Sequence, residues 1–486
     1  MVSFTPDILS FHTDRRINIL SSEQVETLKS GTLQVLAEVG VHFPSRRALG
    51  IFADHSAWVD WEREIVKIPP DLVEKGMSTA PRTFTLAGRE PRFDLLLDGK
   101  RSYLATDGCG VKVFDLESQQ LRPSKKDDVA TMARVCDSLP MVSFFWPLVS
   151  AQDHGLAAPL HECHAGLTNT LKHVRGGTTA IPQIARHIVE MATVVAGSQE
   201  ALRQRPPICA NICTIAPLGH DQDGIEAGLI YAEAGIPTSY MAMPTMGSTA
   251  PATPLGALTT GDAEVVSAMV LVQLLYPGAP VFHSVLVSLM DPRTGGYISD
   301  LPLPLNYIAV QLAHAWKVPS LGGGSLSSDA QDIGWQSGTS SGMGALQVAL
   351  AGGEVCGYLG MLGGSMILSP EQIILDHEIS QNAFDLLHGF EFKEEDIALD
   401  VIAAVGPGDH YLLQKHTRQH IRDFRLSGLL RQKDEGGKWR DPRQVAQEEF
   451  KRRTASHQPE PLNDDLLAEL DSILQAAEME SQQLRE

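Results

Sequence analysis

The chain has 486 residues, of which 43% are hydrophobic and 20% charged, and 39 Lys and Arg against 59 Asp and Glu leave a net charge of −20. This apolar content excludes a disordered chain, and the negative charge argues against nucleic-acid binding, which needs a positive field. The length fits one large α/β barrel with additions, or two to three ordinary domains.

No apolar run reaches the roughly 18–20 residues that span a bilayer. The longest, residues 263–277, ends at a proline and predicts a buried helix instead. The N-terminus lacks the basic, apolar and small segments of a signal peptide. Six cysteines in a chain of this length make no disulfide framework. We therefore expect a cytoplasmic protein with reduced thiols and no membrane contact.

Residues 1–100 are predicted to form an N-terminal extension. Ser21 and Gln24 have the spacing of a capping box, and a helix with one apolar face follows them. Gly40 is a plausible stop for this helix. The stretch from 80 to 100 predicts short strands and turns.

A strand–helix alternation fills residues 101–390, the predicted catalytic domain. Helical patterns are expected near 125–138, 158–171, 181–197, 222–234, 258–276, 302–316, 337–352 and 370–388. Eight such units predict a parallel sheet closed into a (β/α)8 barrel. A doubly wound open sheet is the alternative, but no G-x-G-x-x-G follows the first strand. The strand candidates centre near Tyr103, Phe144, Val174, Cys209, Ser239, Phe282, Pro319 and Gly357.

Residues 391–486 are rich in charge and are predicted to form a helical C-terminal extension. The last segment, 463–486, has leucines at helical spacing, and Asn463 could cap it. This helix is expected either to dock on the barrel or to form a subunit contact.

The segments after the predicted strands are rich in Gly, Ser, Thr and Pro. In a (β/α)8 barrel these segments surround the active site, so small residues there predict an open bowl that suits a large partner or cofactor. The candidate cofactor contacts are Gly247, Ser248, Thr249, Gly323 and Ser325. For any one segment, the simpler interpretation is that Gly and Pro build the turn.

Metal-binding motifs are weak. His161 and His164 share a helix face from which Cys163 points away, and Cys209 and Cys213 lie four residues apart on a strand. Neither pattern has the spacing of a structural zinc site, so we expect no protein-bound metal. The chain also contains neither a P-loop nor a nucleophile elbow with a defensible triad.

Aromatic residues make up only 6% of the chain, yet several fall near strands. Aromatic faces attract quaternary ammonium groups through the ring quadrupole. Trp146, Phe282 and Trp335 are the candidates for such contacts, and core packing is the alternative for each of them.

Several motifs occur in a fixed order between about 101 and 380: TLKHV at 170–174, APL at 216–218, MPTMGSTAP at 243–251, MDPRTG at 290–295 and DAQ at 329–331. This stretch resembles the trimethylamine methyltransferase family, specifically its members that lack pyrrolysine, which include glycine betaine:corrinoid methyltransferases. The resemblance also implies a (β/α)8 barrel.

The resemblance implies transfer of a methyl group from a quaternary amine, such as glycine betaine, to the cob(I)alamin of a separate corrinoid protein. The family's pyrrolysine position is expected within or near residues 321–328, and the absence of pyrrolysine from this chain argues against trimethylamine as substrate. A quaternary ammonium leaves as a neutral tertiary amine, so no proton must be delivered and catalysis is mostly orientation and desolvation. A zinc-dependent thiol-activating methyltransferase and a non-catalytic betaine-binding barrel are the alternatives.

Polar residues near the predicted barrel mouth complete the expected site. His283, Arg293 and Asp291 are the candidate catalytic residues, although Asp291 and Arg293 could instead form a local salt-bridged turn. A betaine carboxylate needs donors, which His173, His283 or Arg293 could supply; a buried core histidine is the alternative for His173. We expect a homo-oligomer. The candidate substrate-binding residues are Trp146, His173, Phe282, Trp335, Gln331 and Asp329, and Asp107, Gln152 and Asp153 are further polar candidates.

Overall fold

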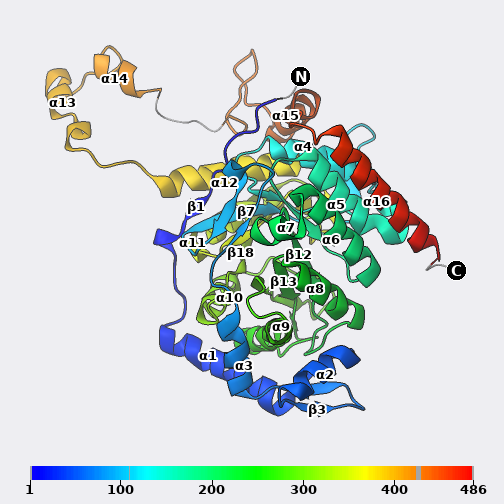
Figure 1. The fold of residues 1–486 in the computed structure, drawn as a ribbon. Helices are drawn as coiled ribbons and strands as arrows, with labels where there is room; N and C mark the ends of the chain where they lie inside the picture. Colours follow the sequence, from blue (N-terminus) through cyan, green and yellow to red (C-terminus); the bar gives the residue numbers. More distant parts are fainter. Residues whose placement is uncertain (1–2, 109, 423–427, 484–486) are drawn as a thin grey trace.

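The computed structural model describes residues 3–108, 110–422 and 428–483. Its centre is a sheet of eight parallel strands in the order β15-β13-β12-β11-β10-β7-β19-β18 (Figure 1). A parallel bridge from His283 in β15 to Ser320, just before β18, joins the two ends of this order. The predicted (β/α)8 barrel is therefore confirmed. The strands are β7 (Arg101–Thr106), β10 (Phe144–Phe145), β11 (His173–Gly177), β12 (Ile208–Cys213), β13 (Thr238–Ala242), β15 (Val281–Val285), β18 (Leu321–Ser325) and β19 (Val355–Leu359).

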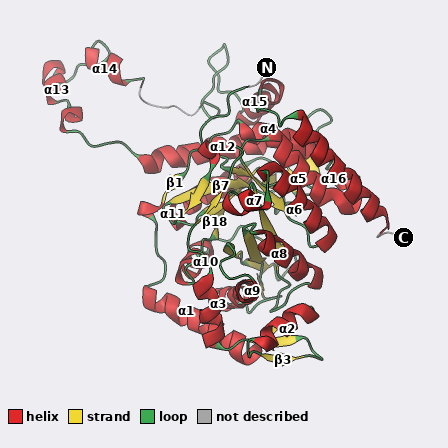
Figure 2. Cartoon of the chain, viewed as in Figure 1, coloured by secondary structure: helices red, strands yellow, loops and turns green. Residues whose placement is uncertain are grey.

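Helices surround the strands on the outside of the barrel (Figure 2). The positions of eight of these helices agree with the predicted ones to within a few residues, and the short helix at 199–204 was not predicted. The predicted apolar helix is α9, which is long and apolar enough to cross a membrane. However, 78% of its 18-residue apolar stretch is buried inside the protein. The helices are α4 (Lys126–Asp137), α5 (Ala158–Asn169), α6 (Pro182–Ala196), α7 (Gln199–Gln204), α8 (Gln222–Ala234), α9 (Pro254–Leu275), α10 (Leu305–Ala315), α11 (Trp335–Ala351) and α12 (Pro370–His388).

The N-terminal extension packs against the barrel helices. Helix α1 (Ser22–Gln34) begins with the predicted capping box, because Gln24 N–H donates to Ser21 Oγ at 3.3 Å and Gln24 Oε1 accepts from Ser21 N–H at 2.9 Å. It continues as a π-helical turn to Gly40, whose φ of 89° ends it as predicted. Helices α1 and α3 (Pro70–Thr79) contact α9. Helix α2 (Arg46–Asp54) and a small sheet of β2 (Val41–His42), β3 (Trp58–Asp60) and β4 (Ile65–Lys67) complete this part.

The N-terminal end of the barrel is closed by a hairpin of β5 (Phe84–Leu86) and β6 (Leu95–Leu97). Buried leucines of this hairpin pack in one cluster with Tyr103, Phe144 and Phe282, which lie near the beginning of three barrel strands. Strand β1 (Phe11–His12) pairs with the start of β7, next to the same end. Access to the barrel interior is therefore from the C-terminal ends of the strands.

Small sheets form the rim of the open end. One contains β14 (Thr245–Met246), β16 (Ser288–Met290) and β17 (Tyr297–Ile298). The other contains β8 (Lys112–Asp115), β9 (Gln120–Pro123), β20 (Met361–Leu362) and β21 (Ile367–Leu368). These insertions lie between barrel strands and their following helices, where active-site loops of such barrels are found.

The C-terminal region has two parts. Helices α13 (Leu399–Val405) and α14 (Lys415–His420) lie on a segment that extends away from the body (Figure 1). Helix α15 (Pro442–Ser456) packs on α12 and α4, and α16 (Asp464–Gln483) packs on α5 and α6. Asn463 Oδ1 accepts from Leu466 N–H at 2.8 Å and so caps α16 as predicted. The terminal helix therefore docks on the barrel; the predicted residues 484–486 lie outside the described chain.

Candidate functional site

A cavity of about 930 Å³ opens at the C-terminal ends of the barrel strands. Residues at or just after the end of every barrel strand line it, from Asp107 after β7 to Tyr358 in β19. A volume of this size is ordinarily filled by a drug-sized ligand, so a small amine alone would leave room for a second reactant.

The charged and aromatic residues of this cavity have a clear bias. Three carboxylates and three aromatic rings line it, whereas no Lys, Arg or His does so among the described residues. Methionines and other apolar side chains form much of the remaining wall. Such a lining suits a cation, because aromatic faces and carboxylates both attract positive charge. The six residues are Asp107, Asp221, Asp300, Trp146, Tyr297 and Tyr358.

Asp107 is the most deeply placed of the three carboxylates and is 5% exposed. Its Oδ1 accepts from the Gly108 N–H at 2.8 Å, and its Oδ2 accepts a short hydrogen bond from the Ser365 hydroxyl. Burial raises the pKa of this carboxyl to about 6, although these hydrogen bonds and Arg175 oppose the shift. A cation in the cavity would stabilise the ionised form of Asp107.

Trp146 and Tyr358 form an aromatic pair at the cavity floor. Their ring centroids lie 6.1 Å apart, and the ring planes meet at 61°. Tyr358 reaches this position because its backbone turns sharply after Gly357, with φ values of 114° at Gly357 and 47° at Tyr358. A non-glycine residue in this region is strained, and such strain tends to occur at functional sites. Gly108 leaves the space for the indole, since a Cβ there would lie 2.1 Å from Trp146 Nε1.

Arg175 lies fully buried against this floor. The guanidinium carbon is 3.9 Å from the centroid of the Trp146 ring, and Nη2 donates to Asn211 Oδ1 and Ser239 Oγ, both at 2.8 Å. Its Nε and Nη1 have no hydrogen-bond partner among the described residues. Burial lowers the pKa of Arg175, but a guanidinium stays charged in proteins. A buried charge with two free donors is costly, and an anionic group on a ligand could satisfy it.

A turn of acidic residues holds one side of the cavity entrance. Asp329 accepts from the Ser299 hydroxyl at 2.6 Å and from the Asp300 N–H at 2.9 Å. Asp300 in turn accepts from the Asp329 N–H at 3.0 Å and the Ser340 hydroxyl at 2.8 Å. Asp300 lines the cavity, whereas Asp329 positions it from behind.

The predicted catalytic residues do not lie in this cavity. His283 points out of the barrel, where its Nε2 is 2.6 Å from Oδ1 of Asp262 on α9, and both side chains are fully buried. The expectation that His283 faces the barrel mouth therefore does not hold, because its neighbour Phe282 takes the inward position. Asp291 and Arg293 form the local salt-bridged turn that was the alternative, with Arg293 Nε 3.1 Å from Asp291 Oδ1 and the Arg293 side chain 84% exposed.

The predicted substrate-binding residues divide into three groups. Trp146 lines the cavity as expected. His173 and Phe282 are buried inside the barrel at its closed end, where His173 Nδ1 lies 3.0 Å from the Ala87 carbonyl and Phe282 meets Phe84 edge-on at 4.9 Å. Burial lowers the pKa of His173 to about 3, so it stays neutral. The third group lies outside the cavity lining: Trp335, which is 94% exposed, Asp329 and Gln331.

Of the predicted cofactor contacts, Ser325 lines the cavity. Gly247, Ser248 and Thr249 form a turn around β14 on the rim, and Gly323 lies within β18; none of these four lines the cavity. Ser325 and Ser327 belong to the segment in which we expected the family's pyrrolysine position, and both have small side chains that leave the cavity open.

Sequence reasoning missed Arg175, Asn211 and Tyr358 as site candidates, and also the lining residues Asp221, Tyr297 and Asp300. The sequence does contain a signal for Arg175. Arg175 lies two residues after His173 in the same predicted strand, so both side chains point to the same face of the sheet. A charged residue in the middle of a buried strand is rare unless it is paired or functional.

A separate group of possible metal ligands lies outside the cavity. His154, His161 and Glu478 each offer an atom within 4.8 Å of the others, and Glu478 Oε1 is 2.9 Å from His161 Nε2. Lys126 Nζ is 3.0 Å from the other ring nitrogen of His161. A metal ion there would add positive charge beside the Lys126 ammonium, so a close polar contact that joins α16 to α5 explains this group better.

The site can now be compared with known proteins. Residues 7–480 match the sequence profile of the family described as Trimethylamine methyltransferase (MTTB). The chain belongs to this family. It is 32% identical over 468 residues to the Trimethylamine methyltransferase MttB of Desulfitobacterium hafniense (strain DSM 10664 / DCB-2), which covers 95% of this chain and 94% of that protein.

A second relative is the Glycine betaine methyltransferase of Desulfitobacterium hafniense (strain Y51), which is 29% identical over 417 residues, covering 84% of this chain and 86% of that protein. Among solved structures, the Methanosarcina barkeri Monomethylamine Methyltransferase (MtmB) matches with a TM-score of 0.51 at 10% identity, covering 98% of this chain and 90% of that one. This structural match supports the barrel fold alone. The family membership makes the chain a methyltransferase that acts on a methylamine-type substrate.

Proposed function

We propose that this enzyme transfers a methyl group from a quaternary amine, glycine betaine or a related betaine, to the cob(I)alamin of a separate corrinoid protein. The observation that carries the proposal is the cavity lining of three carboxylates and three aromatic rings without a cationic side chain among the described residues. A quaternary ammonium group has no N–H to donate, and aromatic faces together with the charge of a carboxylate can hold it without a hydrogen bond.

The lining residues would act by binding and orientation. Trp146 and Tyr358 would offer ring faces to the methyl groups, and Asp107 would supply negative charge from the floor. When the C–N bond breaks, its electron pair stays on nitrogen and a neutral tertiary amine leaves, so none of these residues must donate a proton. Water excluded from an apolar wall of methionines strengthens the attraction of Asp107 for the cation.

A betaine also carries a carboxylate, and Arg175 is the candidate partner. It contacts Trp146 and Asn211, which both line the cavity, and its Nε and Nη1 have no partner among the described residues. A carboxylate that reached these donors would form a charge-assisted pair and would hold the ammonium at the aromatic floor.

The methyl acceptor would approach through the open end of the barrel. A corrinoid in its Co(I) state would supply the nucleophile. We expect the corrinoid to be held on a separate protein that docks at this end of the barrel, rather than bound permanently in the cavity. The volume left by a small amine and the Ser and Gly residues near the entrance support the same view. A cytoplasmic location is proposed with it, since five described cysteines are free thiols.

The test is a turnover screen with free cob(I)alamin as the methyl acceptor. Turnover is measured by the absorbance change when cob(I)alamin is converted to methylcobalamin. Glycine betaine, proline betaine, carnitine, γ-butyrobetaine, choline and trimethylamine are compared at equal concentration. The proposal predicts turnover of a quaternary amine and little or none of trimethylamine. Equal or greater activity on trimethylamine would overturn it.

Arg175→Met separates the betaines from choline. The variant keeps the side chain's volume roughly but removes the positive charge, so turnover of a betaine should fall about 10- to 100-fold, as for loss of a hydrogen-bonded charge partner worth ~1.5–3 kcal/mol. Turnover of choline should change little. If choline is the preferred substrate of the native enzyme and Arg175→Met leaves every substrate unaffected, the betaine assignment is wrong.

A further inference from the structure

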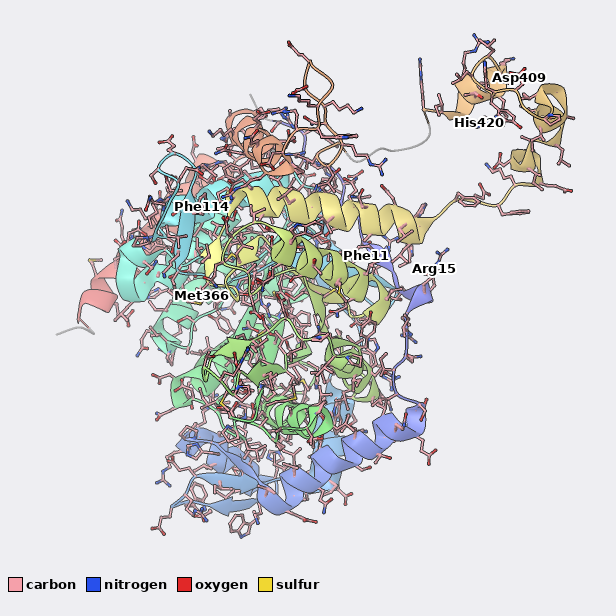
Figure 3. All side chains as sticks on the ribbon, turned by 180° about the vertical axis from the view of Figure 1, so that it is seen from behind. Phe11, Arg15, Phe114, Met366, Asp409 and His420 are labelled. Atoms are coloured by element: carbon pink, nitrogen blue, oxygen red, sulfur yellow. The ribbon has the colours of Figure 1, made fainter. Side chains whose placement is uncertain are left out.

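Residues 389–422 form a segment, the arm, that leaves the body after α12 and carries the 3-10 turn Glu394–Ile397, α13 and α14. None of these three helical elements buries a residue. Figure 3 shows Asp409 and His420 far from the barrel, near the outer end of the arm. The arm therefore makes an excursion into solvent, and the described chain resumes at Gly428 and Leu429, where Leu429 N–H lies 3.3 Å from Oε1 of Glu378 on α12.

The arm exposes far more apolar surface than a free loop ordinarily does. Seven of its large apolar side chains are 48–90% exposed, and Leu412 and Leu413 are neighbours at 74% and 81%. Contiguous exposed apolar residues of this kind mark an interaction surface. The side chains concerned are Phe390, Phe392, Leu399, Ile402, Leu412, Leu413 and Ile421.

The charges of the arm are arranged in two opposite blocks. Residues 391–400, up to the start of α13, contain five acidic residues and one basic residue. Residues 410–422, around α14, contain three Lys and Arg, three His and no acidic residue. A segment with an acidic half and a basic half is complementary to a second copy of itself lying antiparallel, because each acidic half then meets a basic half. A twofold axis produces this arrangement, since it pairs residue i with j and j with i.

The arm leaves the body at the closed end of the barrel, so a protein that binds the arm does not compete with the corrinoid protein at the open end. The last turns of α12 lie at the closed end of the barrel, where the Phe384 ring centroid is 6.2 Å from that of Phe11, and Phe11 pairs with Ser102 at the start of β7. Figure 3 likewise shows Phe11 and Arg15 beside the end of α12 where the arm departs. A methyl acceptor must reach the opposite, open end.

We infer that the arm is a dimerisation element, which packs its apolar side chains and its two charge blocks against the arm of a second copy of this chain. The inference does not depend on the identity of the substrate. It also predicts that the interface is weakened by salt, because part of the attraction is between exposed charges.

The mass of the full-length chain, measured by light scattering after size exclusion, tests this directly. The native chain should have at least twice the monomer mass of 52.7 kDa, and the variant Leu412→Glu/Leu413→Glu should have half the native mass or less. The matched control is Leu96→Glu/Leu121→Glu, which changes two leucines that are 50% and 48% exposed elsewhere and should keep the native mass. The far-ultraviolet circular dichroism spectrum of the arm variant should match that of the native chain, which shows that the variant is folded.

A charge-reversal series identifies the partner as a second copy. Lys415→Glu/Arg418→Glu should give the smaller species, and adding Glu394→Lys/Glu395→Lys to the same chain should restore the native mass. A native chain that is monomeric, an arm variant that keeps the native mass, or a fourfold variant that is not restored would overturn the inference. None of these masses depends on whether the proposed methyl transfer occurs, so the two proposals can fail separately.

Discussion

Replacing Asp107 with asparagine tests the electrostatics of the cavity floor. The side chain keeps its shape and loses its charge. In the empty protein, burial raises the pKa of Asp107 from 3.8 to about 6. At ~1.4 kcal/mol per pKa unit, a difference of roughly two units corresponds to ~3 kcal/mol. The ionised carboxylate therefore lowers the free energy of unfolding by this amount at neutral pH.

The sign of this effect follows from proton binding. Between pH 3.8 and about 6 the native state holds the proton of Asp107 while the unfolded state has released it, so stability falls as the pH rises through this window. Asp107→Asn should therefore raise the melting temperature of the empty protein at pH 7. The difference from the native chain should disappear below the unfolded pKa.

Catalysis should change in the opposite direction. For an ammonium nitrogen about 6–8 Å from the carboxylate, an effective dielectric constant of ~20 gives an attraction of about 2–3 kcal/mol. Loss of this attraction should lower kcat/KM for a quaternary amine about 30- to 150-fold at pH 8. The native profile of kcat/KM should fall below about pH 6 as Asp107 becomes protonated, whereas that of Asp107→Asn should be flat there.

The assay is kcat/KM for methyl transfer to cob(I)alamin between pH 5 and 8, and two variants sharpen it. Ser365→Ala removes a hydrogen bond that lowers the pKa of Asp107, so its inflection should move to higher pH. Asp221→Asn changes another lining carboxylate that accepts from Gly224 N–H and should leave the inflection in place. An Asp107→Asn enzyme that keeps the native inflection, or gains stability without losing kcat/KM, would refute the reasoning.

Three further predictions concern the aromatic floor, a buried ion pair and metal dependence. Trp146→Leu should raise KM for a quaternary amine about 3- to 30-fold, the worth of a cation–π contact of ~0.5–2 kcal/mol, while Trp335→Leu should leave KM unchanged because Trp335 is outside the cavity; equal effects of the two variants would contradict the site. His283→Ala should cost about 3–5 kcal/mol of stability, because it leaves Asp262 buried without its histidine, whereas Arg293→Ala should change the melting temperature little; the opposite order would show that the pair is unimportant. Treatment with EDTA should leave methyl transfer intact, since no group of three metal ligands lines the cavity in the described part of the chain; activity that is lost and then restored by zinc would favour the zinc-dependent alternative.

The fold could be predicted because its signals are local. Most strand candidates are short apolar runs, and most of the following helices have an apolar face with a 3.6-residue period, so the eight units could be read without knowledge of their contacts. The capping box at Ser21 and the stop at Gly40 depend on residues only a few positions apart and were confirmed in the same way.

The site was harder to predict because it depends on the phase and depth of each strand. His283 is one residue from Phe282, and that single step moves its side chain from the barrel interior to the outer layer against Asp262. The side chain of His173 points into the barrel but lies at its closed end. Arg175, two residues further along the same strand, reaches the cavity floor. A buried apolar strand gives no alternation from which this phase could be read.

Loop residues fail for a different reason. Asp291 and Arg293 lie between β16 and β17, and their contact with each other satisfies both charges locally. The position of Trp335 at the first turn of α11, with its ring almost fully exposed, follows from how the preceding loop enters the helix. Neither arrangement could be derived from the spacing of residues in the chain.

In the proposed reaction, a methyl group moves from a quaternary nitrogen to cobalt while the remaining amine leaves. The most direct measurement uses glycine betaine, or the best substrate of the screen, with three deuterated methyl groups, and follows both products by mass spectrometry in a single turnover with cob(I)alamin. We expect one trideuteromethyl group on cobalt for each tertiary amine released, with two trideuteromethyl groups left on that amine. Release of the amine without labelled methyl on cobalt, or binding of the substrate without any demethylated product, would contradict it.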